Sequence, residues 1–513
     1  MHRKIILFCL ISFLLSTITA QAQSLSSRIL DSLTQKPIPY ATVQLKNKGV
    51  ITNEEGQFKF LLDESIQETD SLLISSIGYE SLAKPINEFT KNVIYLSPKA
   101  IELREVIVSN KNFTAEEIVE MVQENLEKNY RKELSKKRLF LRQSDENRVL
   151  KTDYRIKEST IDALNKSFLD SVLSTVPKSD SYYSEMLGDF YGNQEEGQQK
   201  LNIIKASKLF DKSTELDYEL LEKRFNDIIK KNVKTDSYFK VKSGLIGAKV
   251  EAEDFYDTDE AAIDTTDVAA VNKQLEEAKK KKERQKENFA KWKRSSLTNL
   301  YNTLPVFEGT DYNVLWKPNR YHLTLEDFAY IGDKPLYVIS FAPKRSEEYE
   351  GKLYVDADDF ALVKMDFKNV KSIKSFNLLG ISYNVYLKEG SILFNKSNDG
   401  RYDLQYLNVL SAERFGFKRP VQIIEKNKNV KGRRKQNELH LKIDAAFGAR
   451  NRYEIVVFDV ESITKKTFDN FTENNEVLPT YMANYDAEFW KGYTIMEPNT
   501  AIKQFTSQAT SAE

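Results

Sequence analysis

The residue that this chain most nearly lacks is cysteine. Among its 513 residues only Cys9 is a cysteine, and it lies in an apolar run of 11 residues, 5–15, behind the basic pair Arg3-Lys4. A stretch of small residues ending in Ala20-Gln21-Ala22 follows, so residues 1–22 have the pattern of a cleaved secretory signal peptide. The chain after this leader would contain no cysteine, which excludes disulfides, a thiol nucleophile and a thiolate metal site.

Long apolar runs and an excess of charge are also absent. The apolar run of the leader is shorter than the ~20 residues that a membrane-spanning helix needs, and no later run reaches that length. Lipid attachment at Cys9 is disfavoured because Phe8 precedes it where a small residue is required. The 76 basic residues balance 76 acidic ones, which argues against nucleic acid as a partner, since binding it requires a concentrated basic face.

Histidine is nearly as scarce, because only His322 and His440 follow the leader. A zinc carboxypeptidase needs a His-x-x-Glu pair and a distant histidine, but Leu325 stands where the glutamate would be. Both histidines lie in strand-like runs, YHLTL and LHLKI, which predicts ordinary positions in a sheet. The sequence therefore predicts neither a zinc site nor peptidase activity.

Other signatures of catalysis are missing as well. No Gly-x-Ser-x-Gly elbow, Walker-type phosphate loop or Gly-x-Gly-x-x-Gly turn occurs. The acidic strings DFYDTDE and DADD lack the spacing of an EF-hand calcium loop. We therefore predict no catalytic residue, no cofactor and no metal site. Because folding can bring distant carboxylates together, a carboxylate-dependent hydrolase stays open as an alternative.

Alternating apolar residues follow the leader. Residues 36–60 read as two strands, with prolines that keep the approach extended and with Gly56 supplying the positive φ of the turn between them. Later short strands and turns, up to about residue 97, repeat this pattern and indicate a small antiparallel sandwich. The residues expected to face its core are Ala41, Val43, Leu45, Phe58 and Phe60.

Residues 25–97 resemble the carboxypeptidase-regulatory-like domain, a transthyretin-like β-sandwich at the N-terminus of exported proteins of the Bacteroidetes type. The resemblance implies a β-sandwich over residues 23–98 in a protein of the periplasm or outer membrane, without peptidase activity. The matching residues are Pro37, Pro39, Ala41, Val43, Gly49, Thr52, Gly56, Phe58, Leu73, Ser75, Gly78, Tyr79 and Leu96.

The segment behind the sandwich departs from a related pattern. Residues 101–109, IELREVIVS, resemble the segment that follows such domains in TonB-dependent outer-membrane receptors. The sequence that comes next is charged and helical, whereas a receptor plug would be apolar and rich in glycine. We therefore predict a linker over residues 99–112.

A helix-rich middle region is predicted over residues 113–300. Its first helix begins behind Thr114, a candidate N-cap that has Glu117 three residues later. A very polar helix with few apolar positions is expected over residues 268–296, exposed to solvent.

Strand patterns dominate residues 301–465 and predict a curved antiparallel sheet, followed by a C-terminal extension over 466–513. The string EGKLYVDADDFALVKMDF resembles a hairpin of the periplasmic lipoprotein-carrier fold, a half-barrel whose concave face holds acyl chains. This resemblance implies an architecture and no particular cargo. The fold class is therefore mainly β with α: a small N-terminal β-sandwich, a helical middle region and a C-terminal curved antiparallel sheet.

Six basic residues gather in the loop Lys426–Lys435, KNKNVKGRRK. A charged hairpin tip is the simpler interpretation, and contact with anionic lipid is the functional one. Together these features predict an exported, non-enzymatic binding or assembly protein of the cell envelope. Its sandwich would serve placement or contact with another envelope protein, and its curved sheet would bind an apolar ligand such as a lipid, or a partner. An outer-membrane β-barrel with periplasmic N-terminal domains is the second alternative, beside the hydrolase.

Overall fold

A computed structural model describes most of the chain after the leader. The described residues are 23–46, 48–62, 66–89, 92–99, 113–195, 197–234, 236–244, 246–251, 268–397, 399–429, 431 and 435–507, without the side chains of 214–219 and 268–278. The predicted signal peptide, nearly all of the predicted linker and part of the loop Lys426–Lys435 lie outside them. The chain divides into two compact units, 1–99 with 486–499 and 100–485 with 500–513.

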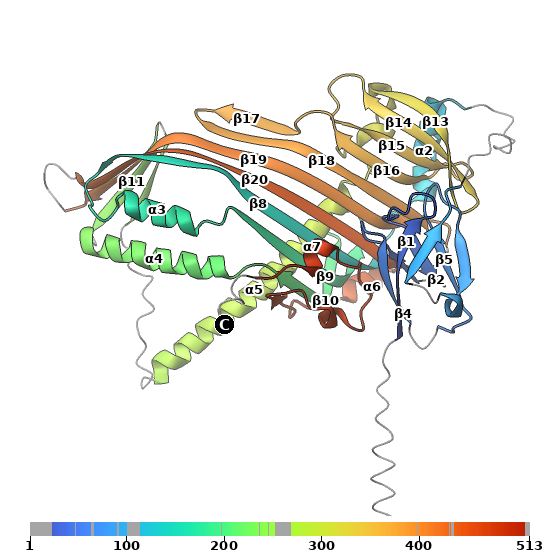
Figure 1. Cartoon of the computed structure of the whole chain (residues 1–513), viewed down its shortest axis with the longest axis horizontal. Coiled ribbons are helices and arrows are strands. Elements are labelled where there is room, and N and C mark those ends of the chain that lie inside the picture. Colours follow the sequence, from blue (N-terminus) through green and yellow to red (C-terminus); the bar gives the residue numbers. More distant parts are fainter. Residues whose placement is uncertain are drawn as a thin grey trace, which may run out of the picture. The chain divides into compact units, whose positions relative to one another are not determined.

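The first unit is a sandwich of two small sheets, with strand orders β4-β1-β7 and β3-β2-β5-β6 (Figure 1). Strands β1 and β7 are parallel, and the other pairs are antiparallel. The elements are β1 (Gln23–Asp31), β2 (Thr42–Leu45), β3 (Lys48–Ile51), β4 (Gln57–Leu62), β5 (Ser71–Ser75), β6 (Leu82–Pro85), β7 (Val93–Leu96) and the 3-10 helices Ile86–Glu88 and Ala487–Trp490.

The core of this sandwich confirms the alternation in the sequence. All five residues predicted to face inward are at most 2% exposed. Gly56 has the predicted positive φ, +73°, and a Cβ atom there would lie 2.4 Å from the carbonyl oxygen of Ile29. A side chain therefore cannot replace this glycine without moving the backbone of β1.

Residues 486–499 belong to the first unit, although they stand near the end of the chain. The Asn53 amide donates to the carbonyl oxygen of Pro498 at 3.2 Å, and the Asn499 amide donates to Glu54 at 2.6 Å. The sequence analysis placed this segment in the C-terminal extension. Asn53 also stabilises the turn at Gly56, because its side-chain oxygen accepts from the Gln57 amide. One side chain therefore links this turn to the segment 486–499.

The second unit is built on a 14-stranded sheet with the order β13-β14-β15-β16-β18-β19-β20-β8-β9-β10-β21, with β17 beside β18 and the hairpin β11–β12 beside β19. Among the strands of this sheet that the structure describes, only β10 and β21 pair in parallel. The strands are β8 (Ser135–Ser159), β9 (Ser179–Gly192), β10 (Gln199–Leu209), β11 (Ser237–Ser243), β12 (Ile246–Glu251), β13 (Tyr321–Ile331), β14 (Lys334–Pro343), β15 (Tyr349–Asp356), β16 (Leu362–Asn369), β17 (Lys374–Leu378), β18 (Ile381–Lys396), β19 (Tyr402–Asn427), β20 (Lys435–Ser462) and β21 (Thr480–Met482).

The helices of this unit lie against the sheet. They are α2 (Ala115–Asn129), α3 (Lys166–Thr175), α4 (Ser213–Asn232), α5 (Val268–Asn302), α6 (Lys465–Asn470) and α7 (Thr500–Lys503), with 3-10 turns at Asn313–Leu315 and Pro318–Arg320. The predicted capping box of Thr114 and Glu117 opens α2. Among the helices that the structure describes, none combines the length and apolar character needed to cross a bilayer.

The middle region contributes strands as well as helices. Strands β8, β9 and β10 continue the sheet beyond β20, and β11 pairs with β19. Strands β9 and β10 lie within the predicted helix-rich region, 113–300, and were not predicted as strands. Residues 183–192 are buried without a break, because both faces of β9 are covered there, and a strand of this kind has no alternation to detect.

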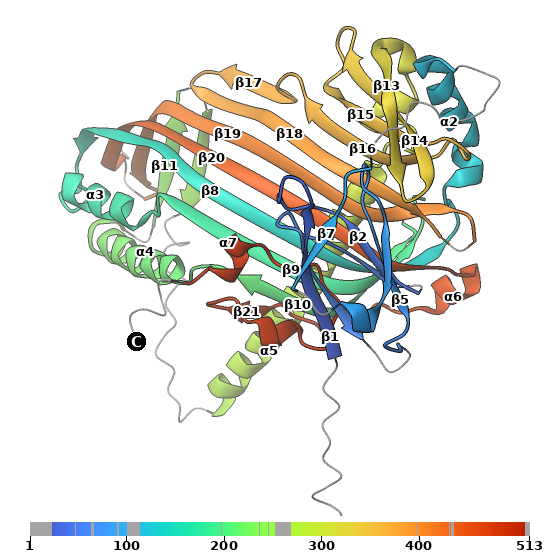
Figure 2. The same cartoon turned by 45° about the vertical axis from the view of Figure 1, so that its right-hand side comes forward.

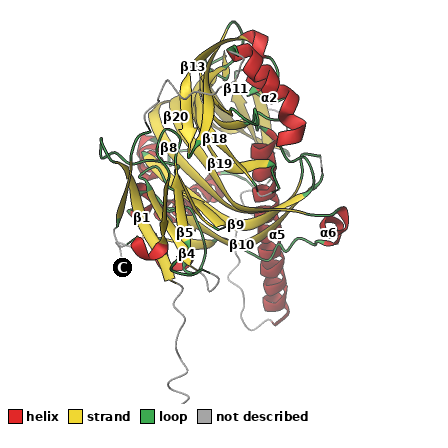
Figure 3. Ribbon diagram, turned by 90° about the vertical axis from the view of Figure 1, so that its right-hand side faces the viewer, coloured by secondary structure: helices red, strands yellow, loops and turns green. Residues whose placement is uncertain are grey.

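Strands β8, β19 and β20 are 25 to 28 residues long and arch over α3 and α4 (Figures 1 and 2). Alternate residues of β20, among them Leu439, Phe447 and Tyr453, share one side of the sheet, which we call the inner face. Helices α3 and α4 cover one end of this face. Helix α5 runs along β10 (Figure 3) and covers the other end, where Tyr301 stacks on Phe190 of β9 at 5.4 Å.

The opposite face carries a buried row of charged residues. Arg142 of β8 is the direct neighbour of Glu185 on β9 and of Glu454 on β20. Its guanidinium donates to Glu185 at 2.7 Å, and Glu454 accepts from the Tyr406 hydroxyl at 3.0 Å. The side chains of Arg142 and Glu185 are 2% and 4% exposed, so the pair is shielded from solvent.

We predict that Arg142→Ala lowers the free energy of unfolding by about 3–5 kcal/mol, because the Glu185 carboxylate would stay buried without its cation. Urea unfolding of the full chain measures the change. Arg155→Ala on the same strand is the control: that arginine is exposed, and its removal should change stability by less than about 0.5 kcal/mol. Equal effects of the two replacements would contradict the prediction.

Candidate functional site: an apolar track with a polar end

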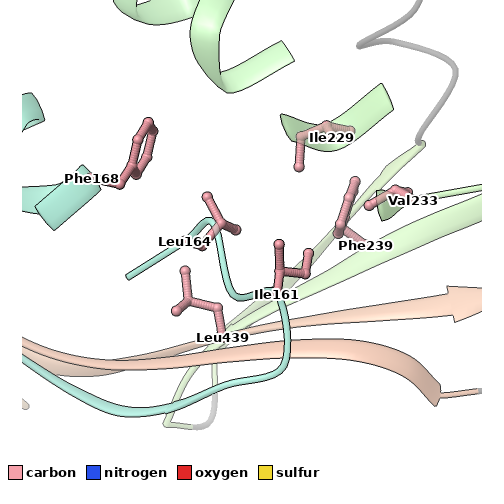
Figure 4. Close-up of a cluster of buried hydrophobic side chains, with 7 residues drawn as sticks. All are labelled: Ile161, Leu164, Phe168, Ile229, Val233, Phe239 and Leu439. Carbon is pink, nitrogen blue, oxygen red and sulfur yellow. The ribbon is translucent and has the colours of Figure 1, made fainter. Parts of the chain in front are cut away.

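An apolar pocket lies beneath α3 and α4 at one end of the inner face (Figure 4). Its volume is about 120 Å³. Buried side chains from four separate stretches of sequence meet around it, in the segment before α3, in α4, in β11 and in β20. The lining residues are Ile161, Leu164, Phe225, Ile229, Phe239, Val241, Val250, Ile423, Glu425, Asn437, Glu438 and Leu439.

Local sequence explains how the two helices come to cover the pocket. Asn165 caps α3 by accepting from the Phe168 amide at 3.1 Å, which starts the helix where the chain leaves β8. In α4, Phe225 and Ile229 follow helical spacing and point to the sheet, and Phe225 stacks on Phe168 at 6.5 Å. Each helix therefore buries one apolar stripe over the end of the long strands.

The few polar groups at the edge of the pocket are satisfied. Glu425 is 1% exposed and accepts from the Ser237 hydroxyl at 2.6 Å and from the Asn437 amide at 2.7 Å. Since its carboxylate is already hydrogen-bonded within the protein, Glu425 needs no hydrogen bond from a ligand. The interior of the pocket is accordingly suited to an apolar group.

Pairs of largely apolar residues lead from this pocket to the middle of the sheet. They are direct neighbours on β19 and β20, on the inner face, and we call these ten residues the apolar track. The track covers nine residues of β20, 439–447, whose eight steps span about 27 Å of antiparallel strand. Its pairs are Ile423–Leu439, Val421–Leu441, Arg419–Ile443, Phe417–Ala445 and Phe415–Phe447.

The track opens at Phe415 and Phe447, which are 41% and 39% exposed. Large apolar side chains that stay this accessible on a monomer's surface are typical of an interaction site. A hollow of about 400 Å³ lies beside them. Its cause is the row of direct neighbours Glu413, Ala449, Asn147 and Asp180, because the small Ala449 lies between longer side chains.

The inner face becomes polar beyond this hollow. Asp145 and Gln143 follow at alternate positions of β8, and Ser184 on β9 is the direct neighbour of Gln143. Lys293 of α5 lies over them, fully buried and in electrostatic interaction with Asp145. The Gln143 amide donates to one oxygen of Asp145 at 2.7 Å. We call these four residues the polar end.

Burial shifts the charges of the polar end toward neutrality. It lowers the pKa of Lys293 to about 7, against which the attraction of Asp145 acts. It also raises the pKa of Asp145. Desolvation penalises a charged form in both cases, so the structure keeps opposite charges here at a cost in free energy.

His440 lies between two carboxylates near the pocket. Its Nε2 atom is 3.0 Å from Glu438 and its Nδ1 atom is 3.9 Å from Glu158. The three residues are the group best placed for a metal ion among the described side chains. Each carboxylate faces a different ring nitrogen, however, whereas one ion would need both on the side of one nitrogen. His322 of β13 is exposed.

Sequence reasoning assigned no residue to a site, and the track shows why. Each of its residues has the ordinary alternation of a strand, and only the pairing of β19 with β20 aligns them. Part of the loop Lys426–Lys435 is described: Lys428 pairs with Glu251 at 2.8 Å, and Lys435 contacts Glu438. Its contact with lipid stays a prediction.

Comparison with known families bears on the first unit. Residues 25–108 match the family model of the CarboxypepD_reg-like domain. The N-terminal sandwich is a carboxypeptidase-regulatory-like domain. This confirms the resemblance predicted from residues 25–97. All residues of the track and of the polar end lie outside the regulatory-like domain.

Solved structures give a weak similarity. A LolA superfamily protein from Nitrosomonas europaea is 10% identical, over 70% of this chain and 98% of that one, at a TM-score of 0.16. The Pseudomonas aeruginosa MucA/MucB complex is 7% identical, over 65% of this chain and 93% of that one, at a TM-score of 0.15. TM-scores this low carry no argument about fold or function. Comparison with curated proteins gives no match.

We predict that Lys293→Met changes how stability depends on pH. Below about pH 7 Lys293 is charged in the folded and the unfolded chain. Between about pH 7 and the ordinary lysine pKa near 10.5, only the unfolded chain keeps the proton, so stability rises with pH by up to ~1.4 kcal/mol per unit. Methionine removes this contribution, and the variant should gain most over the parent below pH 7.

Urea unfolding between pH 6 and pH 10 measures this difference. Lys291→Met is the matched control, because Lys291 lies on the exposed side of the same helix. The stability difference between this control and the parent should not change with pH. A gain from Lys293→Met that is equally large at every pH would contradict the prediction.

Proposed function

We propose that this chain is an exported, non-enzymatic binding protein of the cell envelope that holds an apolar chain on the inner face of its large sheet. The observation that carries the proposal is the largely apolar track, which leads from the hollow at Phe447 into the pocket beneath α3 and α4 and is interrupted only at Arg419, whose guanidinium donates to the carbonyl oxygen of Ser243. In this reading the alkyl chain of a lipid, or an apolar segment of a partner, lies along the track and ends in the pocket.

Dimensions and chemistry both favour an alkyl chain. The track is longer than the ~15 Å of hydrocarbon in one leaflet of a bilayer. The pocket at its end resembles in size an apolar cavity of ~150 Å³ that stays dry and takes up benzene. Since the lining is apolar and its polar edge is satisfied, the free energy of binding would come from the removal of apolar surface from water.

The regulatory-like domain has a separate role in this proposal. It contributes no residue to the track, and we assign it to placement of the protein or to contact with another envelope protein. Export itself rests on the pattern of residues 1–22.

The affinity for straight-chain alcohols tests the proposal. From butanol to decanol, each added methylene group should strengthen binding about fourfold until the track is full, because a buried methylene contributes ~0.8 kcal/mol. Isothermal titration calorimetry with the full chain, below the solubility limit of each alcohol in water, measures the series. Affinity that does not depend on chain length would rule the proposal out.

A pair of variants locates the binding. Val241→Phe places a larger side chain in the lining of the pocket, so the gain per methylene should stop at a shorter alcohol. Leu220→Phe adds the same ring to α4 at a position that is 68% exposed, and it should leave the series unchanged. Two variants with identical series would place the alcohols elsewhere.

A further inference from the structure

Four buried polar atoms of the polar end have no hydrogen-bond partner among the described residues. They are the Nζ atom of Lys293, the Oε1 atom of Gln143, the Oδ1 atom of Asp145 and the Oγ atom of Ser184, which interacts with the Tyr182 hydroxyl only outside hydrogen-bond geometry. Buried polar groups are hydrogen-bonded in the great majority of native structures. Four unmet groups in one place are therefore a feature that needs an explanation.

Strand register and helix position bring these atoms together. Gln143 and Ser184 are direct neighbours across β8 and β9, and Asp145 is the next residue of β8 on the same face. Lys293 reaches them from α5 and interacts electrostatically with Asp145, but no ion pair joins the two within the described structure. An ammonium and a carboxylate thus interact at a distance, and each has unmet hydrogen bonds.

We propose that the polar end binds a zwitterionic head group, with an anionic oxygen at Lys293 and a primary ammonium at Asp145. The ammonium offers three donors, which match the free oxygens of Asp145, Gln143 and Ser184. The anionic oxygen supplies the acceptor that Lys293 lacks. Both bonds are charge-assisted and therefore stronger than bonds between neutral groups.

Ligands of a single charge fit less well. A simple anion would meet Lys293 but would be repelled by Asp145, which has Asp180 beside it. A metal cation or a simple ammonium would meet the carboxylate but would leave Lys293, which lies over the Trp292 ring at 4.6 Å, without a hydrogen-bond acceptor. Only a group with both signs of charge satisfies both sides, and removing buried charges from water without such compensation is costly.

The polar end follows the hollow on the same face of the sheet. Asp145 is two positions from Asn147, which lines the hollow, a separation of about 7 Å along β8. The track begins on the other side of the hollow, at Phe447. The inference rests on the proposed function and names its ligand class: an amphiphile with an alkyl tail in the track and a zwitterionic head at the polar end.

Three short-chain phospholipids with the same dihexanoyl tails test the head group. Dihexanoyl phosphatidylethanolamine has a phosphate and a primary ammonium, phosphatidylcholine has no N–H donor, and phosphatidylglycerol has no positive charge. We expect the first to bind the full chain about tenfold more tightly than the other two, as measured by calorimetry below the micelle concentration. Equal affinity for all three would overturn the inference.

Variants assign the selectivity to residues. Asp145→Asn should reduce the preference for the ethanolamine head to within about twofold. Lys293→Met should weaken all three phospholipids by a similar factor, and burial of a methionine there is compatible with folding. Asp327→Asn is the control, since Asp327 is exposed on β13, and it should keep the full preference. A preference that survives Asp145→Asn would overturn the assignment.

Free phosphoethanolamine and the alcohol series separate the two proposals. Weak binding of phosphoethanolamine alone, lost in Asp145→Asn, supports the polar end even if alcohols do not bind, and the apolar track would then fall. If the alcohols bind but the three phospholipids have equal affinities, the apolar track is supported and the head-group site is ruled out.

Discussion

The continuous pairing of β8, β19 and β20 is the constraint on which the rest of the large unit depends. Because residues alternate between the two faces of a strand, a shift of register by one residue would move every inner side chain to the other face. The direct neighbours Phe415 and Phe447, Ile423 and Leu439 therefore fix the track as a whole. The buried row around Arg142 on the opposite face is fixed by the same register, since its charges can meet only there.

Strands of this length create a face that the helices do not cover completely. Helices α3 and α4 bury one end around Leu439, and α5 buries the other around Lys293. Between them Phe415 and Phe447 stay about two-fifths exposed. The chain thus leaves apolar surface in contact with water where a longer covering helix would have removed it, and the free energy that this surface would contribute to folding is available for binding.

The sequence predicts what is local and misses what depends on register between distant segments. Phe58 and Phe60 alternate within one strand, and Thr114 caps a helix three residues before Glu117, so both were predictable. The pairing of Asn53 with Pro498 and the alignment of the track were not, because their partners are far apart in the chain. Helix α5 was expected to be exposed throughout: residues 279–285 are exposed, but Ala290, Lys293, Leu297 and Tyr301 form a buried stripe. Because one of these four positions is a lysine, the helical spacing of the buried residues was not evident in the sequence.

Lys293 affects both the stability of the fold and the proposed binding of a ligand. At this position on α5 a methionine would pack against the sheet without the cost of desolvating a charge, and hydrophobic replacement of buried charges often stabilises a protein. The cost is concentrated beside Asp145, Gln143 and Ser184, whose free atoms lie next to the hollow. Near the pocket, by contrast, Glu425 is paired with Ser237 and Asn437, although the single hydroxyls of Tyr301 and Ser243 elsewhere in the unit lack a partner among the described residues. A cluster of unsatisfied polar groups at one end of a largely apolar face has the form of a binding site, because a ligand that completes its hydrogen bonds would offset the cost of burying these groups.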